Sequence, residues 1–395
     1  MKRFFSYTIL SFFLLLLPTG QASANNNDSI RLSLLTCAPG EEIYSLFGHT
    51  AIRYENSSQG IDVVFNYGLF SFNTPNFIFR FSLGETDYQL GATDYERFAA
   101  EYAFFGRSVW QQTLNLTDEE KTELIRLLQE NYRPENRVYR YNFFYDNCAT
   151  RPRDKIEESI AGKVIYPAEP QDGSLTFRDI VHQYCKGHPW ARFGIDLCIG
   201  SEADQPITQR QMMFAPFYLM DAFDGAQIKG DSIQRPLITA NELIVDATPE
   251  PEESDWMPTP LQCSLLLFIL TAAATIYGIR RRTGLWGIDL FLFGIAGIVG
   301  CVLAFLALFS QHPAVSSNFL LLVFHPGQLL FLPYIIYCVR KGKKCWYLTL
   351  NLAVLTLFIV LFPVIPQRFD FAVVPLALVL LIRSASNLIV TSKKK

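Results

Sequence analysis

Hydrophobic and polar residues in the first part of the chain follow patterns typical of short strands. Residues 31–36 have the pattern of a strand, and residues 44–54 end in an alternation of apolar and polar positions. A polar turn at 56–60 separates this alternation from a second predicted strand at 61–67, which predicts a β-hairpin. Further extended chain is expected at 73–84, 87–90, 109–116 and 138–144.

Helical periodicity begins twice in this region behind a predicted N-terminal cap. Thr117 and Glu120 have the spacing of a capping box, and the helix behind them is predicted to extend to residue 131. Thr93 and Glu96 have the same spacing at the start of a predicted helix at 93–105. The mixture of strands and helices indicates an α+β domain over 25–245, with more helices expected at 149–160, 177–185 and 209–223.

The last third of the chain consists mostly of apolar segments. Residues 246–260 are acidic and proline-rich, a composition typical of a linker. Behind this linker we identify five apolar segments of roughly membrane-spanning length, at 261–279, 286–309, 319–339, 346–365 and 371–390. The pattern therefore predicts an all-α bundle of five transmembrane helices over 261–395.

Basic residues predict how these helices are oriented. Basic clusters follow the first, third and fifth segments, at 280–282, 340–344 and 393–395. The two remaining loops, 310–318 and 366–370, contain one basic residue in total. Because basic loops stay on the cytoplasmic side, the C-terminus is predicted to be cytoplasmic and both weakly charged loops to lie outside.

The N-terminus gives an independent argument for the same orientation. Residues 1–24 contain a basic start, an apolar run and a small-residue site in the order of a signal peptide, with cleavage predicted after Ala24. An uncleaved anchor is the alternative, although the apolar run is short for spanning a bilayer. In both cases the domain from residue 25 onward is exported.

Length and charge limit the class of protein. A chain of 395 residues suggests roughly two to three units of ordinary size. The net charge is −3, and no long basic run exists outside the membrane-flanking clusters, which argues against nucleic acid as a partner. The sequence has no CxxC pair and no pattern of metal ligands, so we expect neither a metal nor a cofactor.

Cys148 is the candidate nucleophile of the exported domain. It follows Asp146 and Asn147, which are good N-cap residues, and it precedes a predicted helix. A thiol at a helix N-terminus lies at the positive end of the helix dipole, which favours the thiolate. The alternative is a buried structural cysteine. Two other exported cysteines, Cys185 and Cys198, either form a disulfide or stay free.

His49 is the candidate base. It lies at a predicted strand start beside Gly48, and a glycine there lets another group approach closely. A Cys–His pair also needs a third polar group to orient the imidazole ring. Asn66 on the following strand is the first candidate for this group, and Asp62 is the second.

Several motifs together resemble a known family. They are LTCAPG at 35–40, FGHTAIR at 47–53, FNYG at 65–68, PENR at 134–137 and DNCATRPRD at 146–154. Their order along the chain, with a histidine strand, a polar strand and then a cysteine at a helix start, resembles that of circularly permuted papain-like folds such as the NlpC and lecithin:retinol acyltransferase types. They resemble most closely the Lnb-type lipoprotein N-acyltransferases of Bacteroides-type bacteria. The resemblance implies that Cys148 is the nucleophile and His49 its base, but it does not identify the third member.

Membership of this family would place the protein in the bacterial inner membrane, with its catalytic domain in the periplasm. The expected reaction moves an acyl chain from a phospholipid, through a thioester on Cys148, to the α-amine of a diacylglyceryl-cysteine lipoprotein. We predict that substrate is bound by residues beside the thiol and in the outer loop at 310–318. These residues are Asn147, Arg151, Arg153, His312 and Asn318.

A purely structural role is the alternative for several of these residues. Arg151 and Arg153 either meet a lipid phosphate or pair with acidic neighbours such as Asp154 and Glu157. His325, inside the third apolar segment, is either a functional group or a helix-packing residue beside a proline. The same thiol and imidazole would also suit a membrane-tethered cysteine peptidase or amidase of the cell envelope. In a non-enzymatic sensor, the thiol would be inert.

Overall fold

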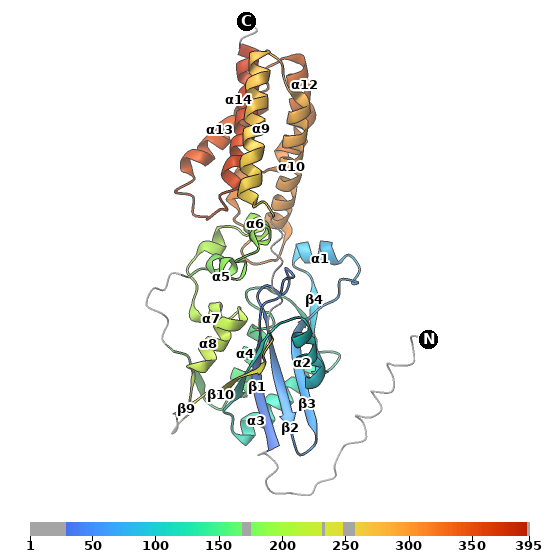
Figure 1. Ribbon diagram of the computed structural model, residues 1–395, viewed down its shortest axis with the longest axis vertical. Coiled ribbons are helices and arrows are strands. Elements are labelled where there is room, and N and C mark those ends of the chain that lie inside the picture. The colour runs from blue at the N-terminus through green and yellow to red at the C-terminus, as the bar shows by residue number, and fades with distance from the viewer. Residues whose placement is uncertain (1–28, 168–174, 231–233, 248–256, 393–395) are drawn as a thin grey trace, which may run out of the picture.

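The computed structural model describes residues 29–167, 175–230, 234–247 and 257–392. An α+β domain forms one end of the elongated molecule and a bundle of long helices forms the other (Figure 1). The predicted signal peptide, the middle of the predicted linker and the last basic cluster lie outside the described residues.

A seven-stranded antiparallel sheet organises the first part, in the order β10-β5-β1-β2-β3-β4-β6. The predicted hairpin is confirmed, with Ala51 directly opposite Asn66. The strands are β1 (Ile30–Cys37), β2 (His49–Asn56), β3 (Ile61–Leu69), β4 (Asp87–Asp94), β5 (Val109–Leu114), β6 (Val138–Arg140) and β10 (Ile238–Val245). A separate three-stranded sheet contains β7 (Lys163–Ile165), β8 (Gln227–Lys229) and β9 (Gln234–Pro236).

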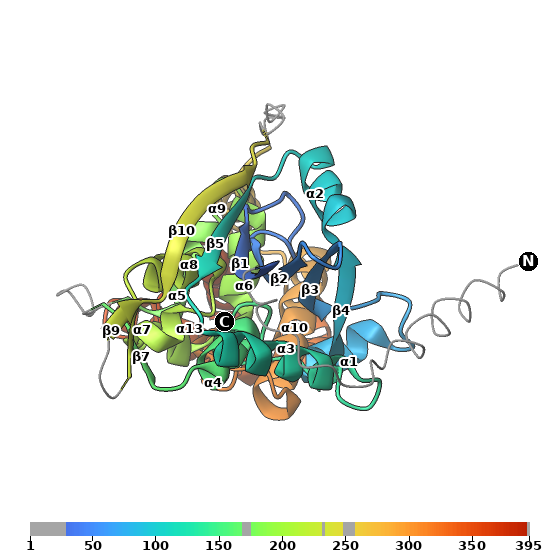
Figure 2. The ribbon, with the colours of Figure 1, turned by 90° about the horizontal axis from the view of Figure 1, so that it is seen from below.

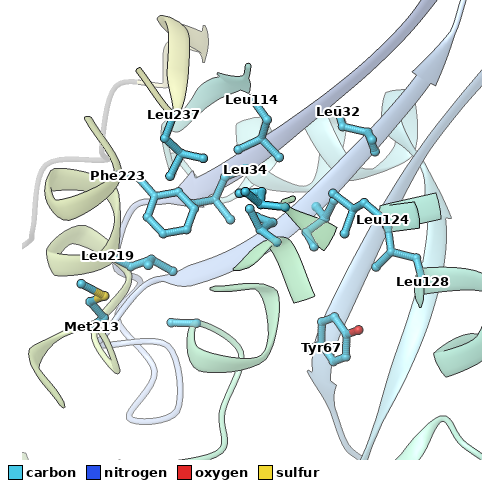
Figure 3. Close-up of a cluster of buried hydrophobic side chains, with 14 of the residues drawn as sticks. Leu32, Leu34, Tyr67, Leu114, Leu124, Leu128, Met213, Leu219, Phe223 and Leu237 are labelled. Carbon is cyan, nitrogen blue, oxygen red and sulfur yellow. The ribbon is translucent and has the colours of Figure 1, made fainter. Parts of the chain in front are cut away.

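Helices cover both faces of the large sheet (Figure 2). On one face α2 packs against β1, β2 and β3 through Phe98. On the other face, α3, α4 and α8 enclose the main core, in which Leu32 and Leu34 of β1 contact the leucines of α3 and Phe223 of α8 (Figure 3). The helices are α1 (Phe77–Leu83), α2 (Tyr95–Phe104), α3 (Asp118–Tyr132), α4 (Thr150–Ser159), α5 (Phe177–Tyr184), α6 (Pro189–Cys198), α7 (Gln209–Met212) and α8 (Pro216–Asp224), with a 3-10 turn η3 (Ser201–Asp204).

The two predicted capping boxes have different outcomes. The box of Thr117 and Glu120 is present at the start of α3. The box of Thr93 and Glu96 is wrong, because Thr93 still belongs to β4, where it pairs with Val64. The chain turns into α2 only at Tyr95, so strand pairing extends past the local helix signal.

One segment has a different secondary structure from the one predicted. Residues 73–84 were expected to be extended, but α1 occupies 77–83. Both ends of this helix are turns with positive φ, at Asn76 and at Gly84, where a left-handed residue ends a helix easily. The many phenylalanines favoured a strand in the sequence, and the closing turns decide for a helix.

The second part is a membrane-type helical bundle, as predicted. The helix lengths show fewer than the five full spans that the sequence predicts. Among the described residues, three helices are long and apolar enough to cross a membrane, or up to four if one bent pair counts as a span. The three are α9 (Pro260–Arg280), α10 (Trp286–Phe309) and α14 (Val373–Ser392). The others are the 3-10 turn η4 (Phe319–Leu322), α11 (Pro326–Leu330), α12 (Leu332–Lys341) and α13 (Trp346–Leu361).

Prolines explain why the third and fourth predicted spans are interrupted. The third span bends by 74° between α11 and α12. Pro333 lies just after this bend, and its ring would clash with the carbonyl of a residue four positions back in a continuous helix. In the fourth span, α13 ends at Leu361, two residues before Pro363, and its 16 residues are fewer than the roughly 20 that a span needs.

The loops predicted to lie outside hold the two parts together. In the first loop, Asn318 donates its side-chain N–H to the carbonyl of Leu197 at 2.7 Å. In the second loop, the Arg368 guanidinium forms ion pairs with Asp179 at 2.5 Å and with Asp204 at 2.9 Å. Both loops therefore lie on the same side as the α+β domain.

Candidate active site

The candidate site lies at the end of the large sheet that is nearest the membrane helices. His49 is the first residue of β2 and lies opposite Cys37, the last residue of β1. The turn with Cys148 comes just before α4 and is stacked on the end of β3, where an added Cβ on Gly68 would be 3.4 Å from the Cβ of Cys148. Gly68 also has a φ of +89°, a backbone conformation that other residues rarely adopt. A glycine therefore suits both this conformation and the close approach of Cys148.

Asn147 shapes the turn that presents Cys148. Its side-chain oxygen accepts the backbone N–H groups of Ala149 at 2.8 Å and Thr150 at 3.0 Å, as an N-cap residue does. Its side-chain N–H group donates to the carbonyls of Phe143 and Phe214. Asn147 is buried, and these four bonds use its hydrogen-bonding atoms, so the contacts are those of a positioning residue rather than a substrate ligand.

The predicted ionisation of Cys148 is wrong for the resting protein. Burial raises the pKa of the Cys148 thiol from 9.0 to about 11. Hydrogen bonds from the backbone N–H groups of Thr50 and of Cys148 itself lower this pKa, but by less than burial raises it. The sulfur is therefore a neutral thiol near pH 7, held next to the residue that follows His49.

His49 is oriented by Asn66, the first of the two candidates. Its Nε2 atom lies 3.3 Å from the side-chain oxygen of Asn66. Since that oxygen only accepts, Nε2 carries the proton and Nδ1 is left as the basic atom. The second candidate, Asp62, is instead held by the Arg53 guanidinium at 2.6 Å and 2.8 Å. Burial lowers the pKa of His49 to about 4, so the ring is neutral.

No hydrogen bond joins the Cys148 thiol to the His49 ring among the described residues. The two groups are placed close together by the Thr50 N–H bond to sulfur. Catalytic hydrogen bonds in unliganded enzymes are often long and tighten only when substrate binds. A neutral thiol beside a neutral imidazole can still react if the imidazole takes the proton during attack.

A buried hydroxyl that the sequence analysis missed lies beside the thiol. The Tyr139 hydroxyl oxygen is 3.9 Å from the Cβ position that Gly68 would have, on the same glycine that Cys148 covers. Tyr139 is buried, and its hydroxyl has no hydrogen-bond partner among the described residues. An unpaired buried donor is costly, and such groups are often reserved for a ligand or a reaction step. No sequence signal separates Tyr139 from the neighbouring tyrosines.

The arginines near Cys148 are engaged within the protein. Arg151 forms an ion pair with Asp146 at 2.6 Å, and its guanidinium stacks over the Tyr139 ring at 3.6 Å. Arg153 is buried and pairs with Asp154. The ion-pair interpretation therefore accounts for both side chains in this structure.

Arg107 is a different cation, and the sequence analysis did not select it. Its guanidinium acts electrostatically on His49 and on Cys37, so it lies at the same sheet end as the site. Its Nε–H group donates to the carbonyl of Ala38 at 2.8 Å. Its guanidinium lies over the Tyr102 ring at 4.7 Å, and no carboxylate pairs with it among the described residues.

The predicted residues of the outer loop lie in the joint between the two parts. The His312 ring contacts the Phe81 ring of α1, and its Nε2 lies within hydrogen-bond distance of the Phe81 carbonyl. Asn318 is buried and uses its side chain to hold α6 and the start of η4. His325 is further away, inside the bundle, 3.3 Å from the side-chain oxygen of Asn351. Each contact is one expected of a packing residue.

The two exported cysteines left undecided, Cys185 and Cys198, are both free thiols. Cys185 is buried among the aromatic residues of α5 and its neighbours, and burial raises its pKa to about 11. Cys148 therefore differs from this cysteine in its surroundings rather than in its pKa. It has a histidine, a free hydroxyl and a glycine platform beside it.

The α+β domain has a thiol and an imidazole at the end that faces the membrane, and it is joined to apolar helices. These features are those of a membrane protein with candidate chemistry at the lipid surface. Residues 20–182 match a family model described as the Lnb N-terminal periplasmic domain, and residues 252–395 match one described as the Lnb transmembrane domain. The chain belongs to the Lnb-type lipoprotein N-acyltransferase family, as its motifs suggested. Its N-terminal domain is thus periplasmic. Comparison with curated proteins and with solved structures finds no match.

Proposed function

We propose that the protein transfers an acyl chain from a phospholipid to the α-amine of a diacylglyceryl-cysteine lipoprotein, with Cys148 as the nucleophile and His49 as the base. The observation that carries this proposal is the position of the thiol. It accepts a hydrogen bond from the backbone next to His49, while Asn66 holds Nε2 of His49 and leaves Nδ1 without a hydrogen-bond partner among the described residues. The site also lies beside the membrane helices, where both substrates are anchored.

In the first half-reaction, the sulfur of Cys148 attacks the carbonyl carbon of a phospholipid ester. Nδ1 of His49 takes the thiol proton as the carbon–sulfur bond forms, since the thiol is protonated at rest. The ester carbon–oxygen bond then breaks, and the imidazolium gives the proton to the glycerol oxygen of the leaving lysophospholipid. The product is a thioester on Cys148.

In the second half-reaction, the uncharged α-amine of the lipoprotein attacks this thioester. A carbon–nitrogen bond forms, the carbon–sulfur bond breaks, and His49 moves the amine proton to the sulfur. An amine attacks a thioester far more readily than it attacks an ester, which gives the covalent intermediate its purpose. The low pKa of His49, about 4, keeps the ring neutral near pH 7, so its Nδ1 atom carries no proton when attack begins.

Two groups support the charges that develop in these steps. The Tyr139 hydroxyl, with the backbone N–H of Cys148, donates to the oxygen of the tetrahedral intermediate. The guanidinium of Arg107, which has no carboxylate partner among the described residues, meets the phosphate of the donor lipid. Arg151 then serves indirectly, by holding the Tyr139 ring.

The order of the groups along the chain supports a permuted papain-like fold for the periplasmic domain. His49 comes from an early strand, Asn66 from its hairpin partner, and Cys148 from a later helix start. The inner membrane, with a cytoplasmic C-terminus, is the location that agrees with the outer loops contacting this domain.

The test replaces each reacting group separately in the full chain. Cys148→Ala and His49→Ala should both leave a resident lipoprotein with two acyl chains, as measured by mass spectrometry of its N-terminal peptide. Cys185→Ala removes a free, buried thiol of similar pKa elsewhere in the domain and should leave the third chain in place. Full acylation with folded Cys148→Ala protein would refute the proposal. Release of a peptide instead of acylation would favour a cysteine peptidase or amidase.

A further inference from the structure

The helix α1 exposes an apolar surface that its own domain does not cover. Ile78 is 81% exposed and Phe79 is 58% exposed, and no residue of α1 is buried. Phe72, in the preceding turn, is 64% exposed. The only charged residue of α1, Arg80, turns back to pair with Asp87 of β4 at 2.7 Å. A contiguous apolar patch of this kind marks an interaction site.

Contacts with α10 fix the height of α1 relative to the apolar bundle. The ring of Phe79 lies 5.9 Å from the ring of Phe305 in α10. Phe305 comes four residues before the end of α10 at Phe309, which corresponds to about 6 Å along the helix axis. The backbone of Leu83 accepts the N–H of Gln311, directly beyond that end. The exposed side of α1 therefore lies at the depth where the last turn of an apolar span ends.

From this placement we infer that α1 inserts its apolar side into the outer leaflet of the bilayer. The residues that enter lipid are Phe72, Ile78 and Phe79. Interfacial helices bury their apolar faces about 5–10 Å into the boundary between headgroups and acyl chains, which matches the depth given by Phe305. The occupant is lipid rather than a protein partner, because α1 continues the exposed apolar surface of the last turn of α10, where Leu308 is 74% exposed.

A row of aromatic rings leads from α1 toward Cys148. Phe77 of α1 stacks on Phe70 at 5.7 Å, and Phe70 stacks on Tyr88 at 4.9 Å. Tyr88 in turn stacks on Tyr141 at 4.1 Å. Tyr88 pairs with Tyr139 across β4 and β6, and the Tyr139 hydroxyl and Cys148 both lie against Gly68, so the row ends beside the thiol. We assign this row as the side from which an acyl chain reaches Cys148, a step that rests on the proposed function.

Photo-crosslinking in the full chain tests the membrane contact without using any activity. Benzoylphenylalanine replaces Ile78, Leu308 or Ile165 in turn, and adducts are identified by mass after irradiation of native membranes. Leu308 is the positive control on α10. Ile165 is the negative control, because it is 39% exposed but belongs to β7 of the small sheet, whose strand β9 lies at the end of the domain away from the bundle (Figure 1).

We expect phospholipid adducts at position 78 and position 308 and none at position 165. An adduct at position 78 with protein alone would overturn the inference, and so would the absence of any lipid adduct there while position 308 gives one. Both outcomes are independent of acyl transfer, so they leave the proposed function standing.

A second measurement tests the route to the thiol. Ile78→Asp should raise the KM for vesicle phospholipid by about tenfold, because it removes the burial of one large apolar side chain. It should leave the rate with a short-chain, water-soluble ester unchanged, since that substrate does not have to leave a bilayer. Equal slowing with both substrates would contradict the route. If wild-type protein takes an acyl group from neither substrate, the proposed function fails, and the crosslinking result still decides the membrane contact.

Discussion

Removing a single oxygen atom at Tyr139 should make the protein more stable and less active at the same time. The hydroxyl is buried and has no partner among the described residues, so the folded state has lost its hydration without gaining a hydrogen bond. Such a group costs roughly 1–3 kcal/mol. Tyr139→Phe should therefore stabilise the folded chain by about 1 kcal/mol. The ring remains, and with it the stacking of Arg151 at 3.6 Å.

The same substitution should slow the formation of the thioester on Cys148. Loss of one donor to a tetrahedral intermediate typically lowers the rate by about a hundredfold to a thousandfold. The assay mixes phospholipid vesicles with the full chain and follows the mass of the protein over time. The midpoint of unfolding by denaturant, measured on the same samples in detergent, reports the stability.

Tyr67→Phe is the matched control for this experiment. The Tyr67 hydroxyl donates to the side-chain oxygen of Asn131 at 2.7 Å, so its removal should destabilise the protein by about 1 kcal/mol. It should leave thioester formation unchanged. If Tyr139→Phe forms the thioester at the wild-type rate, or if both variants slow it equally, the hydroxyl of Tyr139 is not the donor and the reasoning fails.

Three further predictions concern charge. Because the pKa of Cys148 is about 11, the rate of its alkylation by iodoacetamide should rise about tenfold per pH unit from pH 7 to pH 10, as measured by peptide mass. Rapid alkylation at pH 7 would contradict a neutral thiol. Asn66→Asp puts a carboxylate 3.3 Å from Nε2 of His49 and should raise the pKa of this ring from about 4 by roughly 1–3 units. The acid limb of the pH–rate profile should therefore move to higher pH. An acid limb that does not move would show that His49 is not the base of the reaction. Inside the bundle, the side chains of Asp289 and Arg383 are both 2% exposed and pair at 2.7 Å. Asp289→Ala should therefore lower the free energy of unfolding by roughly 3–5 kcal/mol and reduce the yield of folded protein, while leucine at both positions should restore much of that yield. A wild-type yield from the single variant would show that the pair is not needed.

The hairpin shows how much the sequence could predict about the site. Alternation of apolar and polar residues predicts which side chains share a face, and the turn predicts the pairing. From these two, Asn66 could be expected close to His49, and the two side chains do meet. The competing candidate, Asp62, lies near the turn of the same hairpin, opposite Glu55, where Arg53 pairs with it, so the same strand pairing favours Asn66 over Asp62.

Capping signals were less dependable, since they describe only one turn of the chain. Thr117 and Glu120 start a helix because nothing else competes for that segment. Thr93 and Glu96 have identical chemistry, but the ladder between β3 and β4 continues through Asp94, and its hydrogen bonds outweigh a cap worth roughly 1 kcal/mol. The helix α1 was missed for a similar reason. Its ends are set by the positive-φ turns at Asn76 and Gly84, and it contacts Phe305 and Gln311, more than 200 residues away, which the local pattern does not contain.

The ionisation of Cys148 was predicted with the wrong sign because only one of two opposing effects can be seen in a sequence. A helix dipole stabilises a nearby anion by roughly 0.3–1 kcal/mol. The rise of the thiol pKa from 9.0 to about 11 corresponds to about 2.7 kcal/mol against the anion, so burial wins clearly. Burial depends on Gly68, Tyr139 and Tyr88, which come from three different strands. A thiol kept neutral in this way reacts slowly near pH 7 unless the imidazole of His49 takes its proton at the moment of attack. The low pKa of His49, about 4, leaves the ring neutral near pH 7 but also makes it a weak base, so proton transfer from the thiol has to accompany attack on the ester rather than precede it.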